Sequence, residues 1–175
     1  MDGNIFPTQP FSRGDLTKEF FEYVKDGNTS KIRIFLRRDR FLNYEFDEQK
    51  QTALHWAALR GQSETAKILI ERKAHINAKD IIGRTPLFHA AKLNNLCLVK
   101  ILLAAKADPM MRTMAGKTPY SVTKNNQIKQ FLMKATLLKI CLPMIPNLKT
   151  RAWVWESEGL YYFQKEDIEK IDDFV

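Results

Sequence analysis

Cysteine is scarce in this chain of 175 residues: it has Cys97 and Cys141, with no Cys-x-x-Cys pair. Two such residues cannot build a disulfide framework and lack the spacing of a zinc site, so we expect two buried thiols and no metal site. Glycine and proline are also sparse, at seven each, which argues against a fibrous or low-complexity chain. The length and composition predict one or two small folded domains.

Long apolar runs are missing as well. The best candidate, residues 135–146, contains Lys139 and is interrupted by Pro143 and Pro146, so we expect no membrane span. The first residues do not show a basic segment followed by an apolar one, and we therefore expect no secretory leader. A reducing, cytoplasmic location follows as an expectation, with the cytoskeleton, the cilium and the nucleus as more particular alternatives.

Residues at catalytic spacing are absent too. His55, His75 and His89 have no nucleophile, carboxylate or second ligand at the spacing of a catalytic triad or a zinc site. Gly116-Lys117-Thr118 resembles the end of a phosphate-binding loop, but Met111 stands where that loop needs its first glycine. We expect no enzyme activity, no catalytic residue and no cofactor.

Acidic residues are rare in the middle of the chain. Residues 1–51 carry nine charges of each sign, whereas residues 52–152 carry 17 Lys and Arg against four Asp and Glu. Residues 153–175 reverse this balance, with seven carboxylates against two lysines. A basic body attracts acidic partners, and the acidic tail offers one within the same chain at a high effective concentration.

A repeating pattern runs through the middle of the sequence. The segment Thr52-Ala53-Leu54-His55-Trp56-Ala57-Ala58 recurs as Thr85-Pro86-Leu87-Phe88-His89-Ala90-Ala91, and again, more weakly, from Thr118, which gives a 33-residue period. Ala66-Lys67-Ile68-Leu69-Ile70 likewise matches Val99-Lys100-Ile101-Leu102-Leu103, and Gly83 matches Gly116. A fixed period of this length is typical of stacked helical repeats.

This pattern resembles the ankyrin repeat, which has the signature T-P-L-H-x-A and the same period. The resemblance implies an all-α solenoid of about four helix-turn-helix units, at about 15–46, 47–79, 80–112 and 113–134. The threonines fit helix N-caps and the prolines fit the first helical position. His55 stands where the family has histidine, so we expect it to bond with Thr52, whereas Phe88 replaces that histidine in the third unit.

Two segments lie outside this predicted array. Residues 1–14, with Pro7 and Pro10, predict an extended arm. Residues 135–175 form the C-terminal part: a short cap helix to about residue 142, then an aromatic and acidic extension. Its aromatic runs, 151–155 and 160–163, flank Glu156-Ser157-Glu158-Gly159 and predict a β-hairpin, and residues 164–175 predict a short helix.

The resemblance implies that partners dock on a concave face made of turn tips and inner helices. Carried over to this sequence, the face consists of Trp56, Leu59, Arg60, Ile81, Ile82, Arg84, His89, Lys92, Leu93, Met114 and Lys117. Tryptophan and arginine commonly dominate binding energies. We expect further contacts from apolar and aromatic residues of the tail, namely Trp153, Trp155, Tyr161, Tyr162, Phe163, Ile168 and Ile171.

The resulting hypothesis is a non-enzymatic protein-interaction module, acting as an adaptor or as a small subunit of a larger eukaryotic assembly, for instance a cytoskeletal or ciliary one. The expected partner is a protein with an acidic and apolar surface, or the chain's own tail. The alternatives are a regulatory or recruiting subunit of an enzyme or channel, and a basic surface that binds nucleic acid or anionic lipid. Nucleic acid is the weaker alternative, because the tail's aromatic residues lie in an acidic segment that repels phosphate.

Overall fold

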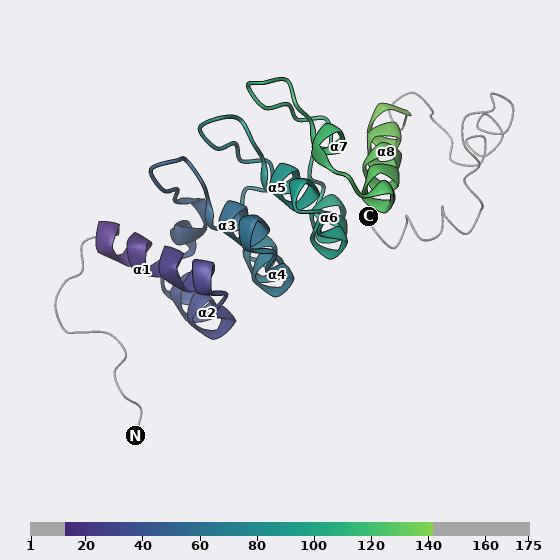
Figure 1. The fold of residues 1–175 in the computed structure, drawn as a ribbon. Helices are drawn as coiled ribbons and strands as arrows, with labels where there is room; N and C mark the ends of the chain where they lie inside the picture. Colours follow the sequence, from purple (N-terminus) through teal and green to yellow (C-terminus); the bar gives the residue numbers. More distant parts are fainter. Residues whose placement is uncertain (1–12, 142–175) are drawn as a thin grey trace, which may run out of the picture.

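The computed structural model describes residues 13–141, with side chains as far as Lys139. Within this range helical hairpins are stacked in a row, each joined to the next by a projecting loop (Figure 1). The predicted β-hairpin and helix of the tail, and the first twelve residues of the predicted arm, lie outside the described residues. In chain order the elements are α1 (Arg13–Asp26), α2 (Thr29–Arg38), the 3₁₀ helix η1 (Arg40–Tyr44), α3 (Ala53–Arg60), α4 (Ser63–Glu71), α5 (Pro86–Lys92), α6 (Leu96–Ala104), α7 (Pro119–Val122) and α8 (Asn126–Cys141).

The hairpins pack in two layers. The inner helices α1, α3, α5 and α7 contact one another in that order, and the outer helices α2, α4, α6 and α8 do the same. Successive inner helices approach closely because the paired alanines, such as Ala57 and Ala58, are fully buried between them. The outer helices contribute large buried side chains, among them Ile68, Leu98 and Ile128. This confirms the all-α solenoid that the resemblance to the ankyrin repeat implies.

The inner helices begin as the threonine positions predict. The Thr85 hydroxyl accepts a hydrogen bond from the Phe88 backbone N–H at 3.3 Å, and Thr118 accepts one from Ser121 at the same distance. In the second unit the Thr52 backbone N–H donates to His55 Nδ1 at 3.1 Å, so the Thr–His arrangement is present there. These bonds satisfy donors that a helix start leaves free.

Three details differ from the expectations. The predicted array boundary at Lys134 falls inside α8, which is one helix because no proline or glycine interrupts residues 126–141. Helix α1 already includes residues 13 and 14 of the predicted arm, and the Thr17 hydroxyl bonds back to the Arg13 carbonyl at 2.9 Å. Cys97 is exposed rather than buried, because the face of α6 that packs on the array carries Leu98, Val99 and Leu102. None of the helices described is long and apolar enough to cross a membrane.

Candidate partner-binding surface

Three loops project from the array, and all have the same internal construction. Asp47 accepts hydrogen bonds from the backbone N–H groups two and four residues later, at 2.9 and 2.8 Å. Asp80 does the same in the second loop, at 3.1 and 2.8 Å, and the Thr113 hydroxyl accepts one from Lys117 at 3.1 Å in the third. These acceptors stand at the same position of successive repeats, and each holds its loop in a tight turn.

Neighbouring loop tips are also hydrogen-bonded to one another. The Ile81 backbone N–H donates to the Gln49 carbonyl at 3.0 Å, and the Met114 N–H donates to the Ile82 carbonyl at 3.0 Å. The three tips therefore form a continuous ridge along one edge of the array (Figure 1).

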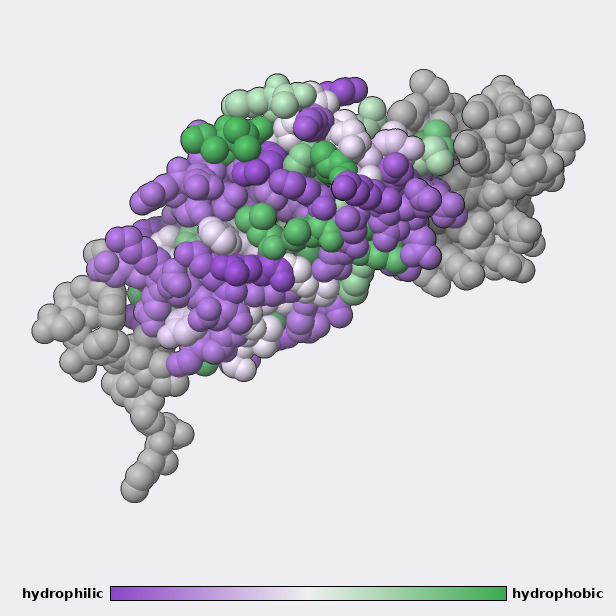
Figure 2. Space-filling view, in the orientation of Figure 1, coloured by the Kyte–Doolittle hydropathy of each residue, from purple (hydrophilic) through white to green (hydrophobic). Residues whose placement is uncertain are grey.

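The second and third tips carry apolar side chains into solvent. Ile81 is 53% exposed, Ile82 44% and Met114 78%, and we call these three residues the tip patch. Figure 2 shows the hydrophobic surface on the ends of these two loops. Exposed Lys117 and Arg112 lie on the third loop beside it. Apolar residues gathered on adjacent tips and flanked by cations have the character of a contact surface rather than of scattered exposed residues.

Other residues expected on the same face lie at the opposite ends of the inner helices. Arg60 is the last residue of α3, Lys92 the last of α5 and Leu93 its C-cap, and all three are exposed. Leu59, also on α3, is partly buried. The structure thus separates the expected set into the tips and the ends of the inner helices.

Trp56 lies in a groove of about 690 Å³ between α1, the first loop and α3. Its indole N–H donates to the Asp47 carboxylate at 2.9 Å, and the Lys25 ammonium lies 4.9 Å from the ring centroid. Carboxylates such as Glu22, as well as cations, line this groove. Its mixed charge agrees with the balanced charges of residues 1–51, which supply most of its lining.

His89 is not available to a partner, contrary to the expectation. It occupies the position equivalent to Trp56 in the next repeat, but its side chain is 2% exposed, because it is packed between the second loop and the His55 ring. Burial and the nearby Arg84 charge lower the pKa of His89 to about 4, so the ring is neutral at pH 7. The neutral form costs less to bury than the charged one.

The Arg84 side chain is likewise engaged in contacts within the chain. Its Nε donates to Asp80 Oδ2 at 2.7 Å, and the side chain is largely buried. Burial by itself would raise the pKa of Asp80, but hydrogen bonds from the Arg84 backbone and guanidinium outweigh it, and that pKa lies below its usual value. His55 Nε2 lies 3.0 Å from the Arg84 carbonyl, which ties the start of α3 to the second loop. Arg84 and His89 therefore build the scaffold of the ridge.

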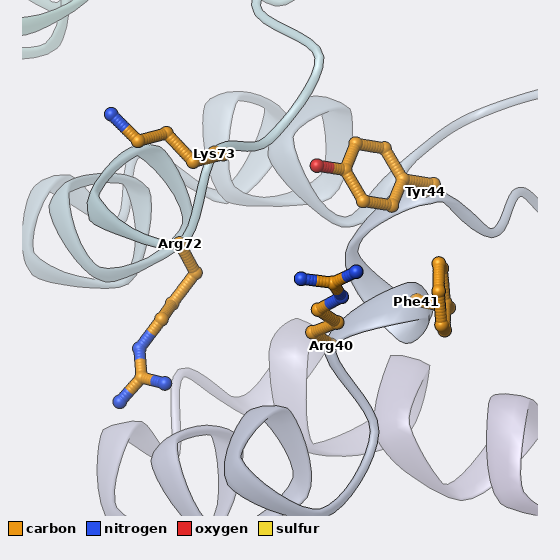
Figure 3. A pocket seen from close by; sticks show the side chains of 5 residues that line it. All are labelled: Arg40, Phe41, Tyr44, Arg72 and Lys73. Atoms are coloured by element: carbon orange, nitrogen blue, oxygen red, sulfur yellow. The ribbon is translucent and has the colours of Figure 1, made fainter.

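A second hollow, on the outer-helix side, was not anticipated from the sequence. Arg40, Phe41 and Tyr44 of η1 line one side of it, and Arg72 and Lys73 at the end of α4 line the other (Figure 3). The signal that could have found it is the 33-residue spacing of Arg40 and Lys73, which repeats in Lys106 and Lys139. The tail residues of the expected set, from Trp153 to Ile171, lie outside the described part of the chain.

The fold and this surface define a class of protein: a solenoid of helical hairpins that binds other proteins. The family model described as Ankyrin repeats (3 copies) matches residues 20–113. The chain belongs to the ankyrin-repeat family. Within residues 13–139, no group of three or more His, Cys, Asp and Glu side chains could hold a metal ion.

Known ankyrin-repeat proteins match the chain over parts of their length. Chicken inversin is 39% identical over 140 residues, which are 80% of this chain and 12% of inversin. An Ankyrin repeat and LEM domain-containing protein 1 homolog from Caenorhabditis elegans is 36% identical over 46% of this chain and 12% of its own length. The 26S proteasome non-ATPase regulatory subunit 10 of Dictyostelium discoideum is 33% identical over 62% of this chain and 45% of its own. The chain thus spans less than half the length of each of these relatives.

Proposed function

We propose that the chain is a non-enzymatic adaptor or small subunit that binds a protein partner through the tip patch. The observation that carries the proposal is the exposure of Ile81, Ile82 and Met114 on adjacent tips that are hydrogen-bonded to each other. The hydrogen bonds fix the loops before binding, so little conformational freedom is lost when a partner covers them.

The partner that fits the patch presents apolar side chains with carboxylates around them. Exposed Lys50, Lys79, Arg112 and Lys117 lie on the three loops, while Asp47 and Asp80 are occupied by hydrogen bonds within those loops. Cations at the rim of an apolar patch favour an acidic surface and raise the rate of encounter with it.

Membership of a larger assembly is the more particular form of this proposal. One relative is named as a regulatory subunit of the proteasome, which supports a subunit role here without identifying the assembly. The cytoplasmic location, with the cytoskeleton, the cilium and the nucleus as its alternatives, stays a prediction. The alternatives of an enzyme- or channel-associated subunit and of a lipid or nucleic-acid binder have no observation of their own on the tip patch.

The test is affinity capture with the tagged full chain and with the variant Ile81→Ser/Met114→Ser. Burying an isoleucine or methionine side chain contributes about 1.5–3 kcal/mol. Because Ile81 and Met114 are already partly covered in the free chain, losing both should weaken a partner's binding by about thirtyfold or more. We expect that the native chain captures a partner protein in an amount close to its own, and that this partner is not recovered with the variant.

The matched control is Ile34→Ser/Phe41→Ser, which removes two exposed apolar side chains from the outer-helix side. This control should retain the partner, and circular dichroism should show the same helix content for all three proteins. Equal recovery with the two variants, or equal loss, would overturn the assignment to the tip patch.

A further inference from the structure

The hollow beside η1 combines unpaired cations with exposed aromatic rings. It has a volume of about 480 Å³, and Phe41 and Tyr44 on its wall are 52% and 47% exposed. Among the residues whose side chains are described, no carboxylate lies within ion-pair distance of Arg40, Arg72 or Lys73. The three cations line the same hollow, and an anionic ligand there would be attracted by all of them.

The hollow lies at one end of a row of basic residues. Arg40, Lys73, Lys106 and Lys139 follow one another at the repeat period, so each repeat contributes one of them at the end of its outer helix or just beyond it. We call these four residues the basic edge. All four are exposed, and Lys139 is paired with Asp108. Favourable interaction with a helix C-terminus can explain a cation at each of these positions, but not the two exposed rings beside Arg40.

The chain leaves α8 on this same edge. The outer helices α4, α6 and α8 pack side by side, and Lys139 in the last turn of α8 contacts Asp108, which follows the end of α6. Helix α8 therefore ends at the end of the basic edge opposite the hollow. Packed helices are about 10 Å apart, so the way from α8 to α4 is about 20 Å and to η1 about 30 Å.

We propose that the chain's own residues 153–175 dock in cis along the basic edge, with their aromatic side chains in the hollow. This segment has seven carboxylates and the rings of Trp153, Trp155, Tyr161, Tyr162 and Phe163, which complement the cations and the rings of the edge. The intervening residues 142–152 can span about 36 Å when extended, which is enough to reach the hollow. The basic edge is separate from the tip patch, so this inference does not depend on the proposed function.

The test is intramolecular photo-cross-linking in the full chain, with Phe41→p-benzoylphenylalanine as the probe. The replacement keeps an aromatic ring in the hollow. After irradiation we expect a monomeric product whose cross-linked peptide, identified by mass spectrometry, falls within residues 153–175. The same probe placed at Tyr120, an exposed aromatic residue of α7, should give at least fivefold less of that product.

Charge variants test the basic edge itself. Lys73→Glu/Lys106→Glu should lower the cross-link yield at least fivefold, whereas Lys73→Arg/Lys106→Arg should keep it. Lys92→Glu/Lys117→Glu makes the same change in net charge elsewhere on the array and should leave the yield within twofold. Raising the salt from about 0.05 to about 0.5 M should also reduce the yield, because salt screens exposed charges.

Three results would overturn the proposal. The first is a cross-link to a second copy of the chain, which would place the tail of one molecule on another. The second is the absence of any peptide from residues 153–175 in the product. The third is an equal loss of yield in the two Glu variants, which would mean that net charge matters but the basic edge does not.

Discussion

His89 makes the stability of the array depend on pH in a way that can be calculated. Its pKa is about 4 in the folded chain, mainly because of burial, against about 6.5 for an unfolded histidine. Since the folded pKa is the lower one, the unfolded chain binds the proton more tightly. The contribution of neutral His89 to the unfolding free energy is therefore present above pH 6.5 and is lost as the pH falls from 6.5 towards 4.

The size of the loss follows from the same two values. Between pH 7.5 and 5.0 the unfolded histidine becomes protonated, while the folded one stays almost entirely neutral. The two states therefore differ by one bound proton over about 1.5 pH units, from the unfolded pKa down to pH 5.0. At about 1.4 kcal/mol per unit, His89 should cost the fold about 2 kcal/mol over this interval. Burial also lowers the pKa of His55, which adds to the loss. The lowered pKa of Asp80 matters only in more acidic solution.

Urea unfolding followed by far-UV circular dichroism at the two pH values measures this loss. The variant His89→Gln keeps a polar side chain that does not titrate, so its decrease in unfolding free energy should be smaller than that of the native chain by about 2 kcal/mol. His75→Gln replaces an exposed loop histidine and should keep the whole decrease. If His89→Gln lost as much stability as the native chain, or if NMR titration placed the His89 pKa near its ordinary value, the reasoning would be refuted.

Three further predictions concern single positions. Lys50 has a φ of 56°, where the next two tips have glycine, so Lys50→Gly should raise the unfolding free energy by about 0.5–1 kcal/mol, whereas Lys79→Gly should not. The Asn94 side-chain oxygen accepts three hydrogen bonds from the fourth unit, one of them from Thr123 at 2.8 Å. Asn94→Gly should lower hydrogen-exchange protection in α7 and α8 by about 1–3 kcal/mol but leave the protection of α3 unchanged. An equal loss in all three helices, or no loss in α7 and α8, would contradict this. Exposed Cys97 should react with a thiol reagent without unfolding, and a rate limited by unfolding would disprove its placement.

The repeat period, through the resemblance to the ankyrin repeat, was enough to predict the class of fold. A unit that cannot bury its apolar side alone must stack on a copy of itself, and the Thr-Pro starts mark where inner helices begin. The resemblance then implies the helical hairpins and their order. The exact end of the array could not be predicted from the sequence. Residues 126–141 contain no helix breaker, and whether such a run is one helix or two depends on what it packs against.

The candidate site was predicted in part. The position of Ile81, Ile82 and Met114 on loop tips follows from the repeat register, and all three side chains are exposed there. The register also placed His89 on the face, but it could not reveal that a side chain there is covered by the second loop. That covering depends on the ion pair of Asp80 with Arg84, a contact between residues whose pairing the period alone does not specify.

The backbone bonds between neighbouring tips have a consequence for how such a chain can change. The Ile81 N–H donates to the Gln49 carbonyl and the Met114 N–H donates to the Ile82 carbonyl. These bonds form only when neighbouring loops have matching lengths. One added or deleted residue would shift these donors away from their acceptors, whereas a substitution leaves them in place. New binding preferences can therefore arise here by exchanging side chains at constant loop length, and a length variant should disturb two repeats at once.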